Sequence, residues 1–131
     1  MSEKNAELAR QAHDALNRRD LPALLALMHA DVEAVPRVAM IEGGYHGHNG
    51  IRRWWEHALD FLPDMVYDVV AVRDLGDLTV TTGRMRGHAA GSDTPLDQAL
   101  WTAAEWRDGK CVWWATYDTE AEAVQAVRLR A

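Results

Sequence analysis

The hydrophobic pattern of this 131-residue chain changes its period near the middle. Apolar residues recur at helical spacing over residues 3–18, after Asp20 and over about 50–62, and a last helical run covers 120–129. Four β-rich runs fill the second half: Met65–Arg73, Leu78–His88, Ala99–Trp106 and Cys111–Asp118. Helices first and strands second predict an α+β fold, with the helices packed on one face of an antiparallel sheet.

Local signals set the limits of these elements. Asp20 is placed to cap a helix that has Pro22 in its first turn. The alternating stretch Asp31–Pro36 predicts a short strand, and the turn Arg107–Lys110 predicts a hairpin. Because the chain lacks repeats, linkers and low-complexity segments, we expect a single domain over residues 1–131.

Charge and cysteine content exclude several kinds of partner. A net charge of −6 and a pI of about 5.4, without a basic stripe, argue against a nucleic-acid partner. Cys111 is the single cysteine, which excludes an internal disulfide and fits a reducing compartment. No apolar run reaches the length of a signal peptide or a membrane span. We therefore expect a cytoplasmic protein without a membrane partner.

A turn punctuated by glycines, Gly44–Gly50, runs into a helix that carries the adjacent residues Trp54 and Trp55. Neighbouring side chains on a helix point in different directions, so at least one of these rings should line a wide apolar space. Six Trp and three Tyr against one Phe suit the lining of a site, although they also suit a tryptophan-rich core. The stretch therefore predicts a pocket.

Five short motifs follow one another in a specific order: Asn17-Arg18-Arg19-Asp20-Leu21, His29-Ala30-Asp31-Val32, Tyr45-His46-Gly47-His48, Asp74-Leu75-Gly76-Asp77 and Asp108-Gly109-Lys110. Together, across nearly the whole chain, they resemble the SnoaL-like branch of the nuclear-transport-factor-2-like superfamily. The resemblance implies a cone-shaped α+β barrel with a strongly bent antiparallel sheet wrapped around three N-terminal helices, then a C-terminal helix. An apolar pocket would open at one end. The superfamily contains isomerases, cyclases, dehydratases, epoxide hydrolases and non-catalytic binders, so the reaction stays open.

Two mechanisms of the superfamily lack their residues here. Ketosteroid isomerases use an Asp base together with a Tyr and a protonated Asp as oxyanion donors. By the resemblance, the base position holds Val35, the Tyr position holds Ala12, and the position of the protonated Asp holds either Thr102 or Ala103. Limonene-type epoxide hydrolases use an Asp-Arg-Asp set, and the matching stretch Arg84–His88 contains no Asp. His88 could still polarise a bound water, but it shares a strand face with Arg84 and Arg86, so a solvated sheet edge is the alternative.

The resemblance points to Asp118 as the main catalytic candidate. Polyketide cyclases of the SnoaL type carry an acid/base Asp late in the final strand, facing the cone. Alternation places Trp114, Thr116 and Asp118 on one face of this strand, and the resemblance assigns that face to the pocket. An apolar cavity would raise the pKa of Asp118 toward a value useful for acid/base chemistry. The last helix begins directly afterwards, so an N-cap is an alternative or additional role.

The aromatic residues divide between the two faces of the sheet. Five are expected to form the substrate-binding pocket: Tyr45, Trp54, Trp55, Tyr67 and Trp114. Cys111, Trp113 and Tyr117 fall on the opposite face, where a monomer would leave the two aromatic rings in water. Superfamily members commonly pair through the outer sheet face, so we expect a homodimer there. The register of the hairpin leaves open whether Trp101 or Trp106 faces the pocket.

The histidines do not predict a metal site. His46 and His48 form the tightest cluster, but no matching carboxylate or second histidine pair lies near them in the sequence. His13 and His57 fall mid-helix beside polar residues and are expected in solvent. No phosphate-binding glycine loop follows a strand, so nucleotide binding has no support, and we expect no cofactor. A Ser-His-Asp set for nucleophilic catalysis is also missing.

Two classes of function remain. The first is a cofactor-independent acid/base enzyme, a cyclase, isomerase or dehydratase, acting through Asp118 or His88. Its substrate would be a small apolar, cyclic compound that carries carbonyl or hydroxyl groups. The second is a binding or accessory domain with a pocket and no turnover. A carboxylate in the pocket would favour the enzyme, and an Asp118 turned to solvent would favour the binding domain.

Overall fold

The computed structural model describes residues 2–37 and 43–131, which form four helices and a six-stranded sheet. The elements are α1 (Ser2–Asn17), α2 (Leu21–Ala26), β1 (Met28–Val35), β2 (Tyr45–His46), α3 (Gly47–Phe61), β3 (Val66–Asp74), β4 (Leu78–His88), β5 (Pro95–Arg107), β6 (Lys110–Tyr117) and α4 (Glu120–Arg130). Across the sheet the order is β2-β1-β6-β5-β4-β3. Neighbouring strands are antiparallel except β1 and β6, which run parallel, so the sheet is mixed rather than purely antiparallel.

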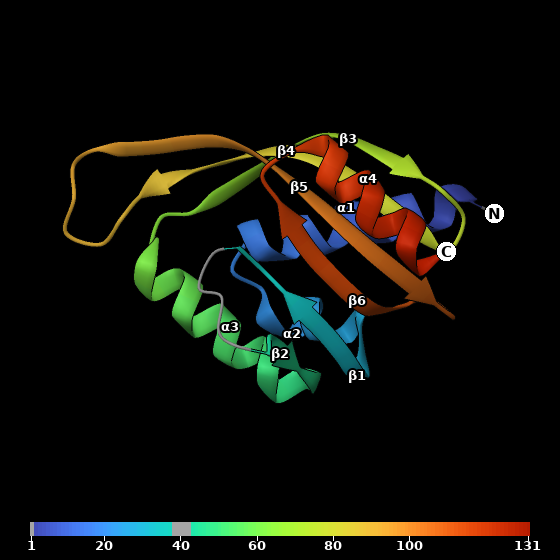
Figure 1. The fold of residues 1–131 in the computed structure, drawn as a ribbon. Helices are drawn as coiled ribbons and strands as arrows, with labels where there is room; N and C mark the ends of the chain where they lie inside the picture. Colours follow the sequence, from blue (N-terminus) through green and yellow to red (C-terminus); the bar gives the residue numbers. More distant parts are fainter. Residues whose placement is uncertain (1, 38–42) are drawn as a thin grey trace.

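The sheet bends strongly without closing into a barrel. Figure 1 shows α1, α2 and α3 on one side of it and α4 across the other side. The predicted fold class, an α+β cone with a bent sheet around the N-terminal helices, is confirmed, although the barrel stays open. Within the described ranges, no helix is both long enough and apolar enough to cross a membrane.

The predicted turn signals act where they were expected. The Asp20 carboxylate accepts a hydrogen bond from the backbone N–H of Ala23 at 3.1 Å and caps α2. Asp108 and Gly109 join β5 to β6 with φ values of 52° and 80°. Both residues therefore adopt the left-handed conformation that a tight hairpin turn needs.

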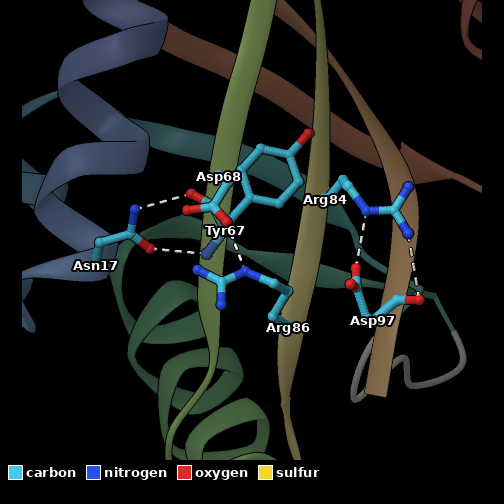
Figure 2. A network of polar contacts seen from close by, with 6 residues as sticks. All are labelled: Asn17, Tyr67, Asp68, Arg84, Arg86 and Asp97. Carbon is cyan, nitrogen blue, oxygen red and sulfur yellow. Dashed lines mark hydrogen bonds and ion pairs between the residues drawn. The ribbon is translucent and has the colours of Figure 1, made fainter. Parts of the chain in front are cut away.

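The corner between α1 and α2 is tied to the beginning of β3. Asn17 donates from Nδ2 to the carbonyl of Tyr67 at 2.8 Å and accepts from the N–H of Tyr67 at 2.9 Å (Figure 2). Its amide therefore pairs with the edge strand as another strand would. Arg19 donates to the carbonyls of Pro63 and Met65, at 3.2 and 2.7 Å. These bonds fix the position of Tyr67 relative to α1.

A second, smaller core lies under α4 on the outer face of the sheet. Ala123 and Val127 of the helix pack against Trp113, and the Arg130 guanidinium lies 4.3 Å from the centre of the Trp113 ring. Trp113 is consequently only 6% exposed, and Tyr117 is partly buried beside it. The expectation that these rings are exposed is wrong, because α4 folds back over them. These two rings therefore no longer support the predicted homodimer through the outer face of the sheet.

Candidate functional site

A cavity of about 90 Å³ lies between α1, α2, α3 and the concave face of the sheet. Helix residues in its wall are Ala9, Ala12, His13, Leu16, Leu24 and Trp54. The sheet and its ends contribute Met28, Pro36, Met65, Tyr67, Thr79, Thr81, Met85, Leu100, Thr102, Ala104, Trp106, Cys111, Trp114 and Thr116. Among these residues there is no Lys, Arg, Asp or Glu. The cavity therefore suits an uncharged ligand, and its three methionines can adapt to the ligand's shape.

Trp54, Tyr67 and Trp114, three of the five aromatic residues expected in the pocket, line this cavity. The rings of Trp54 and Trp114 meet edge to face, with their centres 4.8 Å apart. Trp106 also lines the cavity, whereas Trp101 packs against the outer core. Of the two residues that the hairpin register left open, Trp106 is therefore the one that faces the pocket. The aromatic wall is thus built from α3, β3, β5 and β6.

Tyr45 and Trp55 lie outside the cavity wall. Tyr45 is 1% exposed within the main core, and its hydroxyl is 3.0 Å from Nδ1 of His57. Trp55 is half-buried against the same core. Consecutive residues on a helix point about 100° apart, so Trp54 reaches the cavity while Trp55 turns aside. The expectation that all five rings share one cavity therefore fails for these two.

A β-bulge in β6 changes which of its residues face inward. Glu105 pairs with Trp113, but the next residue, Trp106, pairs with Cys111, so Val112 is an extra residue. The bulge turns Cys111 into the cavity wall, although simple alternation predicts the outer face. Burial raises the pKa of the Cys111 thiol to about 12, which keeps it protonated at neutral pH.

Tyr67 crosses from β3 over the neighbouring strand. A Cβ added to Gly83 would lie only 2.4 Å from the ring, so the ring rests where a side chain at position 83 would be. Its hydroxyl donates to the carbonyl of Leu100 at 2.6 Å. Burial raises the pKa of Tyr67 to about 12, while the hydroxyl of Thr102 acts in the opposite direction. Tyr67 is therefore a fixed, protonated wall residue.

His13 is the candidate site residue that sequence reasoning missed. It was expected in solvent, yet it lines the cavity and stacks on Tyr67, with ring centres 4.6 Å apart and planes inclined by 31°. Burial lowers the pKa of His13 from 6.5 to about 4, so its imidazole is neutral at pH 7. The available signal was position, since Ala9, His13 and Leu16 follow helical spacing along one apolar stripe of α1.

His13 also borders a polar hollow on the outside of the molecule. The other residues of that hollow include Arg10, Asp14, Asn17 and Asp68. The histidine therefore stands between an apolar interior and a hydrated surface. A proton held at His13 can exchange with water at that surface.

Buried threonines supply further polar groups of the wall, in addition to the buried indole N–H of Trp54. Thr79 accepts a hydrogen bond from the indole N–H of Trp106 at 3.0 Å, and Thr116 accepts one from the backbone N–H of Arg37 at 2.6 Å. Thr81 and Thr102 are also buried and line the cavity. Thr116 was expected on the pocket face by alternation, whereas Thr79 and Thr81 were not expected there, since threonine is common in strands on either face.

Comparison with known protein families assigns the chain to one of them. Residues 9–114 match the family described as SnoaL-like domain. The chain belongs to the SnoaL-like domain family. The resemblance inferred from the five motifs is confirmed, and no protein of curated function matches this SnoaL-like chain by sequence.

Solved structures share the SnoaL-like chain's fold. A nuclear-transport-factor-2-like protein of unknown function from Burkholderia pseudomallei has a TM-score of 0.80 at 22% identity, with 93% of this chain and 95% of that chain covered. TerC, crystallised with polyporic acid, has a TM-score of 0.78 at 23% identity, covering 95% and 98%. IdmH from Streptomyces antibioticus, described as a proposed polyketide cyclase, has a TM-score of 0.73 at 21% identity, covering 94% and 97%. At these identities the likeness establishes the fold alone.

Asp118 of this SnoaL-like domain does not face the cavity. Its carboxylate forms an ion pair with Arg37, and both side chains are about half exposed, at 51% and 48%. The strand ends at Tyr117, so the alternation that predicted an inward Asp118 no longer applies. The alternative role is also displaced by one residue, because Thr119 caps α4 by accepting from the N–H of Glu122 at 3.2 Å.

His88, the second catalytic candidate, lies in a row of exposed ion pairs. Its Nδ1 is 2.7 Å from Asp64, and hydrogen bonds from His88 hold the pKa of Asp64 below its usual value. Arg84 pairs with Asp97 at 2.8 Å and Arg86 pairs with Asp68 at 2.6 Å, as Figure 2 shows. These pairs tie β3, β4 and β5 together on the solvent side. In the described part of the chain, no group of three or more His, Cys, Asp or Glu residues could hold a metal ion.

Proposed function

We propose that this SnoaL-like protein is a cofactor-independent acid/base enzyme of the cyclase or isomerase kind. The cavity takes a ring of a small, uncharged compound with carbonyl or hydroxyl groups, and His13 moves the proton. Family membership supports a small-molecule role, as does the fold shared with a proposed polyketide cyclase. The observation that carries the proposal is a neutral imidazole in a wall that contains no Lys, Arg, Asp or Glu.

Among the titratable side chains of the wall, only His13 can accept a proton at neutral pH. Tyr67 and Cys111 each have a pKa of about 12, so both hold their protons. The His13 ring stacks on Tyr67 and has no hydrogen-bond partner within the described residues. A nitrogen lone pair of the imidazole is therefore available to a ligand.

The chemistry follows from this placement. His13 takes a proton from the carbon next to a ligand carbonyl, the C–H bond breaks, and its electron pair moves to the carbonyl oxygen as an enolate. The imidazolium and the enolate then attract each other strongly, because the surrounding wall is apolar. Return of the proton to another carbon completes an isomerisation. Alternatively, the enolate carbon attacks a second carbonyl and closes a ring, and the alkoxide formed there takes the proton back from the His13 imidazolium.

A binding domain without turnover is the second candidate. The observation in its favour is the position of Asp118, which is paired with Arg37 outside the cavity. With Asp118 and His88 both at the surface, a catalytic protein has to rely on His13. The two candidates therefore differ in one property, the exchange of a ligand proton at the cavity.

Proton exchange can be measured before the natural substrate is identified. In deuterated water, the wild-type protein should accelerate deuterium uptake at the carbon next to the carbonyl of 2-indanone. His13→Gln should reduce this acceleration about a hundredfold or more, because a general base contributes at least that much. Its affinity for 2-indanone, measured by NMR titration, should stay within about threefold.

His29→Gln is the matched control, since His29 lies on β1 outside the cavity wall. It should exchange the probe as fast as the wild type. Binding of 2-indanone without any exchange would support the binding domain instead. A protein that neither binds nor exchanges the probe would overturn both functions.

A further inference from the structure

Three threonines lie side by side across the floor of the cavity. In the strand register Thr81 of β4 pairs with Thr102 of β5, and Thr102 pairs with Thr116 of β6. Their exposed fractions are 1%, 9% and 8%, and all three line the cavity. We call these residues the threonine row.

Within the described part of the chain, the protein's own hydrogen bonds involve Thr102 and Thr116 but not Thr81. Thr116 accepts from the N–H of Arg37, which leaves its hydroxyl proton to donate. The Thr102 side chain forms a hydrogen bond with the Tyr67 side chain that lowers the pKa of Tyr67. The Thr81 hydroxyl has no hydrogen-bond partner among the described residues. By contrast, Thr79, two residues earlier on β4, is satisfied by Trp106.

A buried hydroxyl without a partner is unfavourable, and valine would fill the same space without that cost. Neighbouring strands are about 4.8 Å apart, so hydroxyls on adjacent strands present a row of polar atoms at that spacing. Two oxygens in a 1,3 relation on a six-membered ring have a comparable separation. Each threonine hydroxyl can donate or accept, so it can bind either a carbonyl or a hydroxyl oxygen.

We propose that the threonine row binds the ring oxygens of the ligand, and that the ligand carries two such oxygens in a 1,3 relation on one ring. The proposal rests on the cavity being the ligand site, as proposed above. The volume of the cavity, about 90 Å³, is below the roughly 150 Å³ of an engineered cavity that holds benzene, so a ring enters only if the wall moves outward. The three methionines of the wall can supply this movement, because their side chains are flexible.

Toluene, m-cresol and orcinol test this directly. They share one ring and one methyl group and carry zero, one and two hydroxyls, the two of orcinol in a 1,3 relation. Ligand-detected NMR titration should show that the wild-type protein binds them with affinity increasing in that order. Thr81→Val should weaken orcinol about 2- to 10-fold, because one neutral hydrogen bond is lost. Toluene should bind the variant as tightly as before or more tightly.

Two further variants keep the result interpretable. Thr81→Ser retains the hydroxyl and should retain the preference for orcinol. Thr82→Val, on the adjacent residue of β4 that pairs with Trp101 on the outer face, should change neither affinity. Melting temperatures establish that each variant is folded.

The outcomes separate this proposal from the proposed function. Equal binding of toluene and orcinol, or a Thr81→Val variant that weakens both equally, would overturn the role of the row and leave proton exchange by His13 untouched. Binding of none of the three probes would overturn the row and the ligand-binding cavity together. Preference for orcinol with no exchange of 2-indanone would leave the row in place and remove the catalytic function.

Discussion

The imidazole of His13 lies against the phenol ring of Tyr67, with ring centres 4.6 Å apart. Tyr67 is in turn held by Leu100 through its hydroxyl and by Asn17 through its backbone. The proposed base therefore rests on a side chain that is fixed at both ends. Such support is what a proton-transfer group needs to keep its geometry.

Acid should destabilise the protein through His13. The pKa of His13 is about 4 in the folded state and near 6.5 when unfolded, so the unfolded state binds more protons between these values. The contribution of neutral His13 to the free energy of unfolding is fully present above about pH 6.5. It is lost as the pH falls toward 4, by on the order of 2–3 kcal/mol. Urea unfolding across this range measures it. His13→Phe should flatten this part of the profile, and an unchanged slope would contradict the assigned burial.

Gly83→Ala should displace the ring of Tyr67. The new Cβ would lie 2.4 Å from that ring, and overpacking of this kind costs about 1–3 kcal/mol. Thermal unfolding measures the loss. Tyr67→Val removes the ring, so adding Gly83→Ala to it should cost much less than the single change costs. Additive effects of the two changes would show that the ring does not depend on Gly83.

Asp118→Asn should leave deuterium exchange of 2-indanone close to the wild-type rate. The carboxylate is paired with Arg37 at the surface, so it does not reach a ligand in the cavity. The change also leaves the cap of α4 intact, because Thr119 supplies it. A folded variant that loses exchange as severely as His13→Gln would restore Asp118 as the acid/base group.

Arg130→Ala should lower stability by about 1 kcal/mol. The guanidinium covers the Trp113 ring and bonds Glu105 at 2.9 Å, and a partly exposed cation–π contact contributes about that much. Chemical denaturation gives the difference. Arg128→Ala, on the same helix and exposed, serves as the control and should be neutral. Equal effects of the two substitutions would mean that the contact with Trp113 contributes nothing.

The elements with regular patterns were predictable from the sequence. β4 was placed at Leu78–His88 because alternation and the flanking turn agree, and the structure has the same limits. The Asp20 cap and the turn at Asp108–Gly109 were predictable because each depends on a few neighbouring residues. Local chemistry determined these features, so no knowledge of the partners was needed.

The candidate site was harder to predict, because it depends on contacts between distant elements. The bulge at Val112 has no compositional signal, yet it reverses the face of Cys111. Asp118 was assigned to the cavity by extending an alternation beyond the last strand residue. His13 was read as solvated because its neighbours in sequence are polar, whereas its neighbours in space are Tyr67 and the cavity.

Consecutive residues of β6 belong to two different interiors. Trp114 forms part of the cavity wall, while Trp113 lies beneath α4 on the opposite side of the sheet. A single peptide bond thus joins the compartment that would hold a guest to the one that anchors the C-terminal helix. A ligand that displaced Trp114 outward would also displace Trp113, on which α4 packs, because the two residues share one stretch of backbone. The packing of the C-terminal helix would therefore depend on whether the cavity is occupied.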